Sequence, residues 1–163
     1  MKLSPEGRSR LIIYSTFVVA MIFAVIPMPE WARGFRPDWL ALTLIYWCMA
    51  APHRVGVGTG WVVGLLLDVL YGSLLGQHAL AKAVIAYLTI RLHLQLRMFP
   101  MVQQALSVFA LLALNQFIVI WMQSLAGQKP ETLAYVTPLV VGAVIWPWLF
   151  VILRDVRRRL RVA

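Results

Sequence analysis

The chain has 163 residues, of which 61% are hydrophobic and only 13% are charged. This composition excludes a water-soluble globular domain with a polar shell and predicts an all-α integral membrane protein. Six carboxylates oppose fifteen Lys and Arg, and in a membrane protein the resulting charge of +9 reflects topology, so nucleic acid is not expected as a partner.

Apolar stretches separated by proline, glycine and charged residues predict a single transmembrane domain over residues 1–163, a compact bundle of about six helices. The predicted spans lie near 11–28, 38–51, 55–75, 78–95, 100–125 and 133–153. The first follows basic residues, as a signal peptide does, but it is long and ends in Pro27-Met28-Pro29, so we expect it to be retained. The second is short for a full crossing.

The distribution of positive charge favours six crossings over five. With six crossings, eleven Lys and Arg fall on one side of the membrane, three, Arg33, Arg36 and Lys129, fall on the other, and Lys82 lies inside a span. Because cytoplasmic loops collect positive charge, both termini are predicted to be cytoplasmic.

The stretch from Val55 to Lys82 carries small and polar residues at four-residue intervals. They are Gly56, Gly60, Gly64, Asp68, Gly72 and Gly76. Small residues let two helix backbones approach closely in lipid, where packing contacts drive helix association. The pattern therefore predicts either a tightly packed neighbour within the chain or a docking strip for a partner's helix.

Asp68 is the most informative single residue, because a carboxylate within a span costs about 2.5–3.5 kcal/mol to insert. We expect it to pair with Lys82, since a tight turn at 72–76 returns the fourth span to a similar depth. A contact with a partner's helix is the second interpretation, and a proton or cation relay is the third.

The fifth predicted span contains several amide side chains, among them Gln104, Asn115 and Gln116. Buried amides hydrogen-bond between helices, so they are expected to hold the bundle together, with a small polar pocket as the alternative. In the sixth span, Pro138 and Pro147 predict kinks.

A basic cluster follows the last predicted span. Its members are Arg154, Arg157, Arg158, Arg159 and Arg161. Such a cluster is attracted to anionic lipid headgroups and is expected to anchor the topology.

Sequence signals for catalysis are missing. The chain has no metal-ligand spacing of His or Cys, no nucleophile motif, no phosphate-binding glycine loop and no paired carboxylates for acid–base work. We therefore predict no enzymatic activity, no metal and no cofactor.

Several segments carry the pattern of one bacterial family. They are Arg36-Pro37-Asp38-Trp39-Leu40-Ala41-Leu42, Pro52-His53-Arg54-Val55, Gly64-Leu65-Leu66-Leu67-Asp68, Gly72-Ser73-Leu74-Leu75-Gly76 and Trp146-Pro147-Trp148. Through them nearly the whole chain resembles the rod shape-determining membrane protein MreD family, and its proteobacterial members most. Lys82 is not part of that family's pattern.

The resemblance implies a multi-pass protein of the bacterial cytoplasmic membrane, similar in architecture to the six-helix substrate-binding subunits of vitamin importers. It implies a non-enzymatic subunit of the cell-elongation complex that helps organise peptidoglycan synthesis and cell shape. The expected partner is MreC, with MreB, RodA and a penicillin-binding transpeptidase contacted directly or through MreC, and with membrane lipids around the bundle. The alternative is a small-solute transporter or its substrate-binding membrane subunit.

Overall fold

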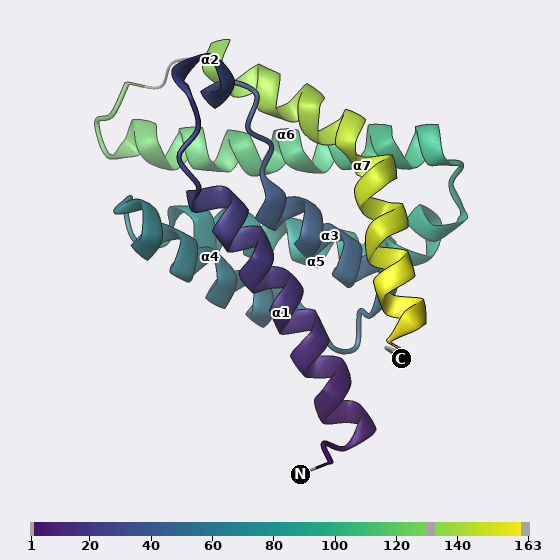
Figure 1. Ribbon diagram of the computed structural model, residues 1–163. Helices are drawn as coiled ribbons and strands as arrows, with labels where there is room; N and C mark the ends of the chain where they lie inside the picture. Colours follow the sequence, from purple (N-terminus) through teal and green to yellow (C-terminus); the bar gives the residue numbers. More distant parts are fainter. Residues whose placement is uncertain (1, 130–132, 161–163) are drawn as a thin grey trace.

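The computed structural model describes residues 2–129 and 133–160, and within them the chain forms helices only (Figure 1). The helices are α1 (Pro5–Val25), α2 (Glu30–Arg33), α3 (Trp39–Ala50), α4 (Val57–Tyr71), α5 (Gln77–Met98), α6 (Met101–Leu125) and α7 (Leu133–Arg159). The start of α1 and the end of α7 lie toward the same end of the bundle (Figure 1).

Four of these helices, α1, α5, α6 and α7, are long and apolar enough to cross a membrane. The prediction of a helical membrane bundle is therefore confirmed. Each predicted span coincides with one apolar helix, although their ends differ by up to six residues. The 12 residues of α3 and the 15 residues of α4 are shorter. At 1.5 Å per residue they rise roughly 18 and 22 Å, against roughly 30 Å of hydrocarbon.

The ends of the helices follow from local sequence. The Ser4 hydroxyl accepts a hydrogen bond from the Gly7 N–H at 3.2 Å and so caps the start of α1. At the other end of α1, the Arg36 guanidinium donates to the carbonyl oxygens of Ala24 and Ile26. Gly72 ends α4 with a φ of 62°, a left-handed conformation that favours glycine.

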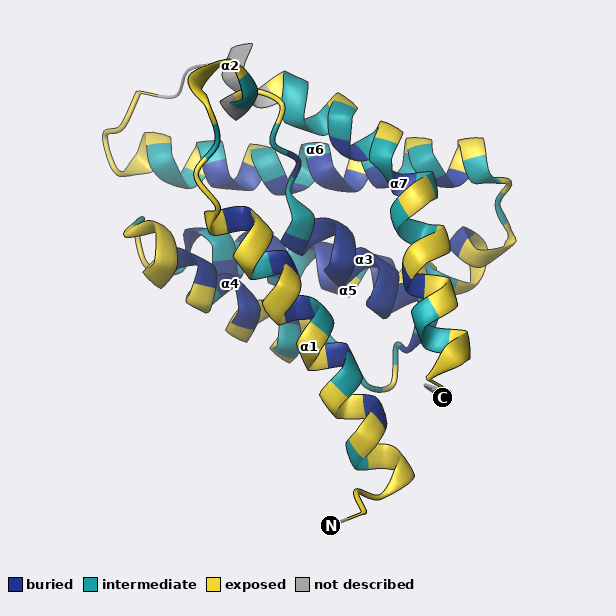
Figure 2. Cartoon of the chain, viewed as in Figure 1, coloured by how far each residue is buried: buried dark blue, intermediate teal, exposed yellow. Residues whose placement is uncertain are grey.

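The core of the bundle is α3. Every residue from Leu40 to Met49 is buried, and α3 contacts α1, α5, α6 and α7 (Figure 2). The Trp47 indole N–H donates to the Thr16 hydroxyl at 2.8 Å, which ties α3 to α1. Because α3 is covered on all sides, it needs no polar face, and this accounts for its almost entirely apolar sequence.

The last helix, α7, contains Pro138 and Pro147, at which kinks were predicted, and its ribbon changes direction part-way along (Figure 1). A proline inside a helix removes one backbone hydrogen bond and bends the axis. Trp146, directly before Pro147, is fully buried, and its indole N–H donates to the Gln104 side chain of α6 at 3.0 Å. A hydrogen bond therefore joins the bent helix to α6 directly before its second proline.

Candidate functional site

The glycines of α4 pack directly on the backbone of α5. A Cβ added at Gly64 would lie 2.4 Å from the Cα of Ala79, and one added at Gly60 would lie 2.8 Å from the Lys82 carbonyl oxygen. Real Cβ atoms do not approach backbone atoms this closely, so these two positions require glycine. The small-residue strip is thus occupied by the chain's own next helix.

The other glycines of the strip have different surroundings. At Gly56 an added Cβ would meet only the end of the Ile90 side chain, at 4.0 Å. Gly72 and Gly76 have positive φ values, 62° and 101°, and form the turn between α4 and α5. The regular spacing in the sequence therefore combines packing positions with turn positions.

Asp68 is fully buried and caps the start of α5. Its carboxylate accepts hydrogen bonds from the backbone N–H groups of Gly76 at 2.9 Å and His78 at 3.0 Å, and from the Ser73 hydroxyl at 3.1 Å. The His78 ring nitrogen Nδ1 lies 2.7 Å from the same carboxylate. The first N–H groups of a helix have no partner within the helix, so a buried carboxylate there satisfies them and faces the positive end of the helix dipole.

The predicted Asp68–Lys82 pair is wrong, and the register of the two helices gives the reason. Gly64 lies against Ala79, and Gly60 lies against Lys82 and Ala86. Lys82 is therefore level with Gly60, about two turns below Asp68 along α4. Asp68 instead meets the first free N–H groups of α5, which the turn brings to it directly.

Lys82 forms a polar cluster with two residues from other helices. Its ammonium nitrogen lies 2.8 Å from the Asp38 carboxylate and 2.9 Å from the Asn115 amide oxygen. The Asn115 amide also donates to Asp38 at 3.2 Å, and Asp38 accepts from the Ala41 N–H at the start of α3. Lys82 and Asn115 are buried, whereas 28% of the Asp38 side chain is exposed. We call these three residues the central cluster; it joins α3, α5 and α6.

Sequence reasoning did not identify Asp38 as a site residue and named it only within a segment of the family pattern. A signal was present, because an Asp directly before the apolar run that starts at Trp39 has the pattern of a helix N-cap. That pattern locates Asp38 at the start of α3. It does not indicate that an amine 44 residues later reaches it.

The amide side chains of α6 that were expected to join helices make contacts in different places. Asn115 belongs to the central cluster, and Gln104 donates to the Leu96 carbonyl oxygen at 3.0 Å while accepting from Trp146. Gln116 is half-buried on the same helix. Asn115 and Gln104 thus act between helices, the role expected for amides in lipid.

Basic side chains gather at the end of the bundle that holds both termini. An Arg54 N–H donates to the Glu6 carbonyl oxygen, and Arg97 donates to the carbonyl oxygens of Met49 and Ala50 at the end of α3. Arg154, Arg157 and Arg158 border a pocket together with Arg97. Arg159 pairs with Asp155 at 2.9 Å, and Arg161 lies outside the described residues.

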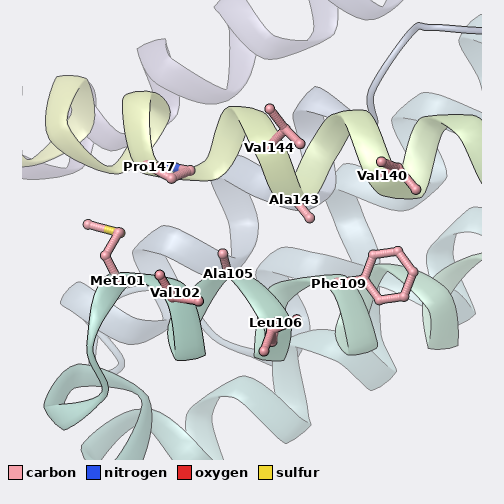
Figure 3. A pocket seen from close by; sticks show the side chains of 9 residues that line it. All are labelled: Met101, Val102, Ala105, Leu106, Phe109, Val140, Ala143, Val144 and Pro147. Carbon is pink, nitrogen blue, oxygen red and sulfur yellow. The ribbon is translucent and has the colours of Figure 1, made fainter.

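Apolar grooves run between helices on the sides of the bundle. One of about 320 Å³ lies between α6 and α7, and Figure 3 shows its lining side chains, with Pro147 at one end of the groove. A second of about 400 Å³ lies between α1 and α4. A third, of about 440 Å³, lies between α1 and α7 with α3 behind it. Each is large enough to hold side chains of another transmembrane helix or a lipid chain.

Metal chemistry has no support in the part of the chain that the structure describes, where no group of three His, Cys, Asp or Glu could hold a metal ion. Asp38, Asp68, Lys82, Gln104 and Asn115 are engaged in helix caps and contacts between helices. This arrangement is typical of buried polar groups in a helical membrane bundle.

Comparison with known proteins decides the family. Residues 8–156 match the family described as rod shape-determining protein MreD. The chain belongs to the MreD family. It is 32% identical over 154 residues to the rod shape-determining protein MreD of Haemophilus influenzae, covering 92% of this chain and 93% of that protein. No solved structure matches the chain, so the likeness to vitamin-importer subunits stays a prediction.

Membership of the MreD family gives the chain a role in determining cell shape. MreD proteins are structural and are not known as enzymes, in agreement with the prediction from sequence. Together with the four helices of spanning length, the family also indicates a multi-pass membrane protein.

Proposed function

We propose that this chain is a non-enzymatic subunit of the cell-elongation complex in the bacterial inner membrane, where it binds MreC and helps organise peptidoglycan synthesis. The observation that carries the proposal is the family match along almost the whole chain. In this proposal MreB, RodA and the penicillin-binding transpeptidase are reached directly or through MreC.

The proposed topology has six crossings and two cytoplasmic termini. Its support is the basic end of the bundle, where the chain ends lie with Arg54, Arg97 and the arginines of α7. Positive charge on the cytoplasmic side is the usual determinant of orientation. The short helix α3 then crosses where its neighbours cover it, and α4 crosses packed on α5 with its other face exposed to lipid.

The groove between α1 and α7 is the proposed seat of the MreC transmembrane helix. Of the grooves described above it has the largest volume, about 440 Å³, and its floor is the core helix α3. Its lining includes Ser15, Thr16, Ala20 and Thr43. Small and hydroxyl-bearing residues favour helix association in lipid, whereas the groove between α6 and α7 offers only apolar side chains.

Bulky substitutions on lipid-facing residues test this seat. Val19 lines the α1–α7 groove and is 50% exposed, while its neighbour Val18 is 54% exposed and lines the α1–α4 groove. We expect Val19→Trp to reduce co-purification of MreC from detergent at least tenfold and to abolish rescue of rod shape in cells lacking their own MreD.

Val18→Trp is the matched control, because it adds the same ring one residue away on α1. Val102→Trp is a second control in the α6–α7 groove, where Val102 is 75% exposed. Both controls are expected to keep MreC bound. Undiminished recovery of MreC with Val19→Trp would exclude the α1–α7 seat, and wild-type cell shape without any MreC binding would contradict the proposed function itself.

A further inference from the structure

The basic end of the bundle contains a pocket of about 260 Å³ that the role in cell shape does not explain. It is formed where α3, α5, α6 and α7 meet. Four of its lining residues are arginines, Arg97 from α5 and Arg154, Arg157 and Arg158 from α7. Four guanidinium groups around one small pocket repel each other unless an anion lies between them.

The positive charge of this pocket is not neutralised by the protein around it. Among the described residues that line it there is no carboxylate, and Asp155, the nearest along α7, points to Arg159 instead. Arg97 donates to two backbone carbonyl oxygens, which hold it in place but carry no net charge. The pocket is therefore a concentrated, positioned source of positive potential.

One wall of the pocket is apolar. Met49 of α3 and Phe150 of α7 line it, and the Arg154 guanidinium lies over the Phe150 ring, 5.9 Å from its centre. A site for a free inorganic anion would not need this wall. A ligand that carries both an anionic group and an apolar part would use both halves of the pocket.

The depth of the pocket matches a lipid headgroup. Val151 and Ile152 are large apolar side chains exposed on the surface of α7, so they face lipid, and the arginines begin two residues after Ile152, at Arg154. The pocket thus lies where the apolar surface of α7 gives way to charge. Phosphate groups of membrane lipids occupy that level of a bilayer.

We propose that this pocket binds the phosphate group of an anionic membrane lipid. The guanidinium groups of Arg154, Arg157 and Arg158 contact the phosphate oxygens, a geometry that arginine provides through paired N–H donors. Met49 and Phe150 contact the first atoms of the lipid's apolar part. This site is separate from the α1–α7 groove proposed for MreC.

Binding of phosphatidylglycerol to the full-length protein in detergent tests the proposal. Arg157→Gln is expected to weaken binding about fivefold, since each basic charge near an anionic headgroup contributes about that factor. Arg159→Gln removes the same charge from the same helix but outside the pocket, and it is expected to change binding less than twofold. If Arg157→Gln fails to fold, Arg158→Gln replaces it, because Arg158 is exposed. The same weakening of about fivefold is expected for Arg158→Gln.

Two probes separate the possible sources of the anion. Phosphatidylcholine and inorganic phosphate are both expected to bind at least tenfold more weakly than phosphatidylglycerol. Inorganic phosphate that competes equally well would overturn the lipid assignment. Equal losses in Arg157→Gln and Arg159→Gln would also overturn it, because they would indicate attraction to general surface charge. MreC co-purification serves as an independent readout that should not change.

Discussion

Asp38 and Asp68 are two carboxylates in one bundle, and they are stabilised in different ways. Asp68 receives hydrogen bonds from groups 5 to 11 residues later in the chain, mostly backbone N–H groups at the start of the next helix. Asp38 is bound by side chains 44 and 77 residues later, one of them a buried ammonium. The first arrangement closes a local turn, and the second holds distant helices together.

This difference has an energetic consequence. At Asp68 the main partners are neutral donors. If the carboxylate loses its charge, these donors still have an oxygen acceptor, although their hydrogen bonds become weaker. At Asp38 the partner is Lys82, which is fully buried and cannot return to water. The loss of the Asp38 charge leaves an ammonium uncompensated in a low-dielectric interior. The same chemical change should therefore have unequal effects at the two sites.

The largest effect is expected for Asp38→Asn. We expect it to lower the free energy of unfolding by about 3 kcal/mol, the low end for breaking a buried pair, because Asp38 is itself partly exposed. Unfolding by SDS titration, followed by circular dichroism in detergent micelles, measures the change.

The double variant Asp38→Asn/Lys82→Met separates the charge effect from loss of packing. It removes both charges and should recover most of the lost stability, because no buried ion remains. A double variant that is less stable than Asp38→Asn would show that the central cluster is not held by charge compensation.

A smaller loss of about 2 kcal/mol is expected for Gly64→Leu, in the range for overpacked cores. The new side chain would displace α5 from α4 and so shift the register that separates Asp68 from Lys82. The free energy of unfolding reports the loss. Gly58→Leu is the control, since an added Cβ at Gly58 meets no atom within 4 Å, and it should leave stability unchanged. Equal losses in both variants would contradict the close contact at Gly64.

The smallest effect is expected for Asp68→Asn, a loss of about 1 kcal/mol, which is typical for weakening a helix cap. The amide oxygen still accepts from the start of α5, but the charge and one acceptor are lost. The same SDS titration applies. A loss as large as that of Asp38→Asn would remove the distinction between the two carboxylates.

Local patterns in the sequence predicted much of the fold. Uninterrupted apolar stretches located all six apolar helices, and the close packing of Gly60 and Gly64 follows from their small size. The turn between α4 and α5 was also predictable, because Gly72 and Gly76 adopt positive φ values that favour glycine.

Pairings between distant residues were not predictable in the same way. Asp38 and Asp68 were both candidates to pair with Lys82, and the choice depends on the register of α4 against α5, in which Gly64 lies against Ala79. The sequence pattern fixes which face of α4 packs, but not how far α5 slides along it. The pocket lined by arginines was not predictable for the same reason. Arg97 of α5 and the arginines of α7 are far apart in the sequence and come together only when the helices pack.

The central cluster has a consequence for how the protein is made. Of the four helices of spanning length, α5 has the lowest hydropathy, and it carries the Lys82 ammonium into the bilayer. Alone in lipid that charge is costly. Asp38, however, precedes α5 in the chain, so its carboxylate is synthesised before Lys82 needs it. The N-terminal part of the chain should therefore assist the insertion of α5 by supplying the Asp38 carboxylate to Lys82. A chain that lacks the N-terminal helices should leave α5 outside the membrane.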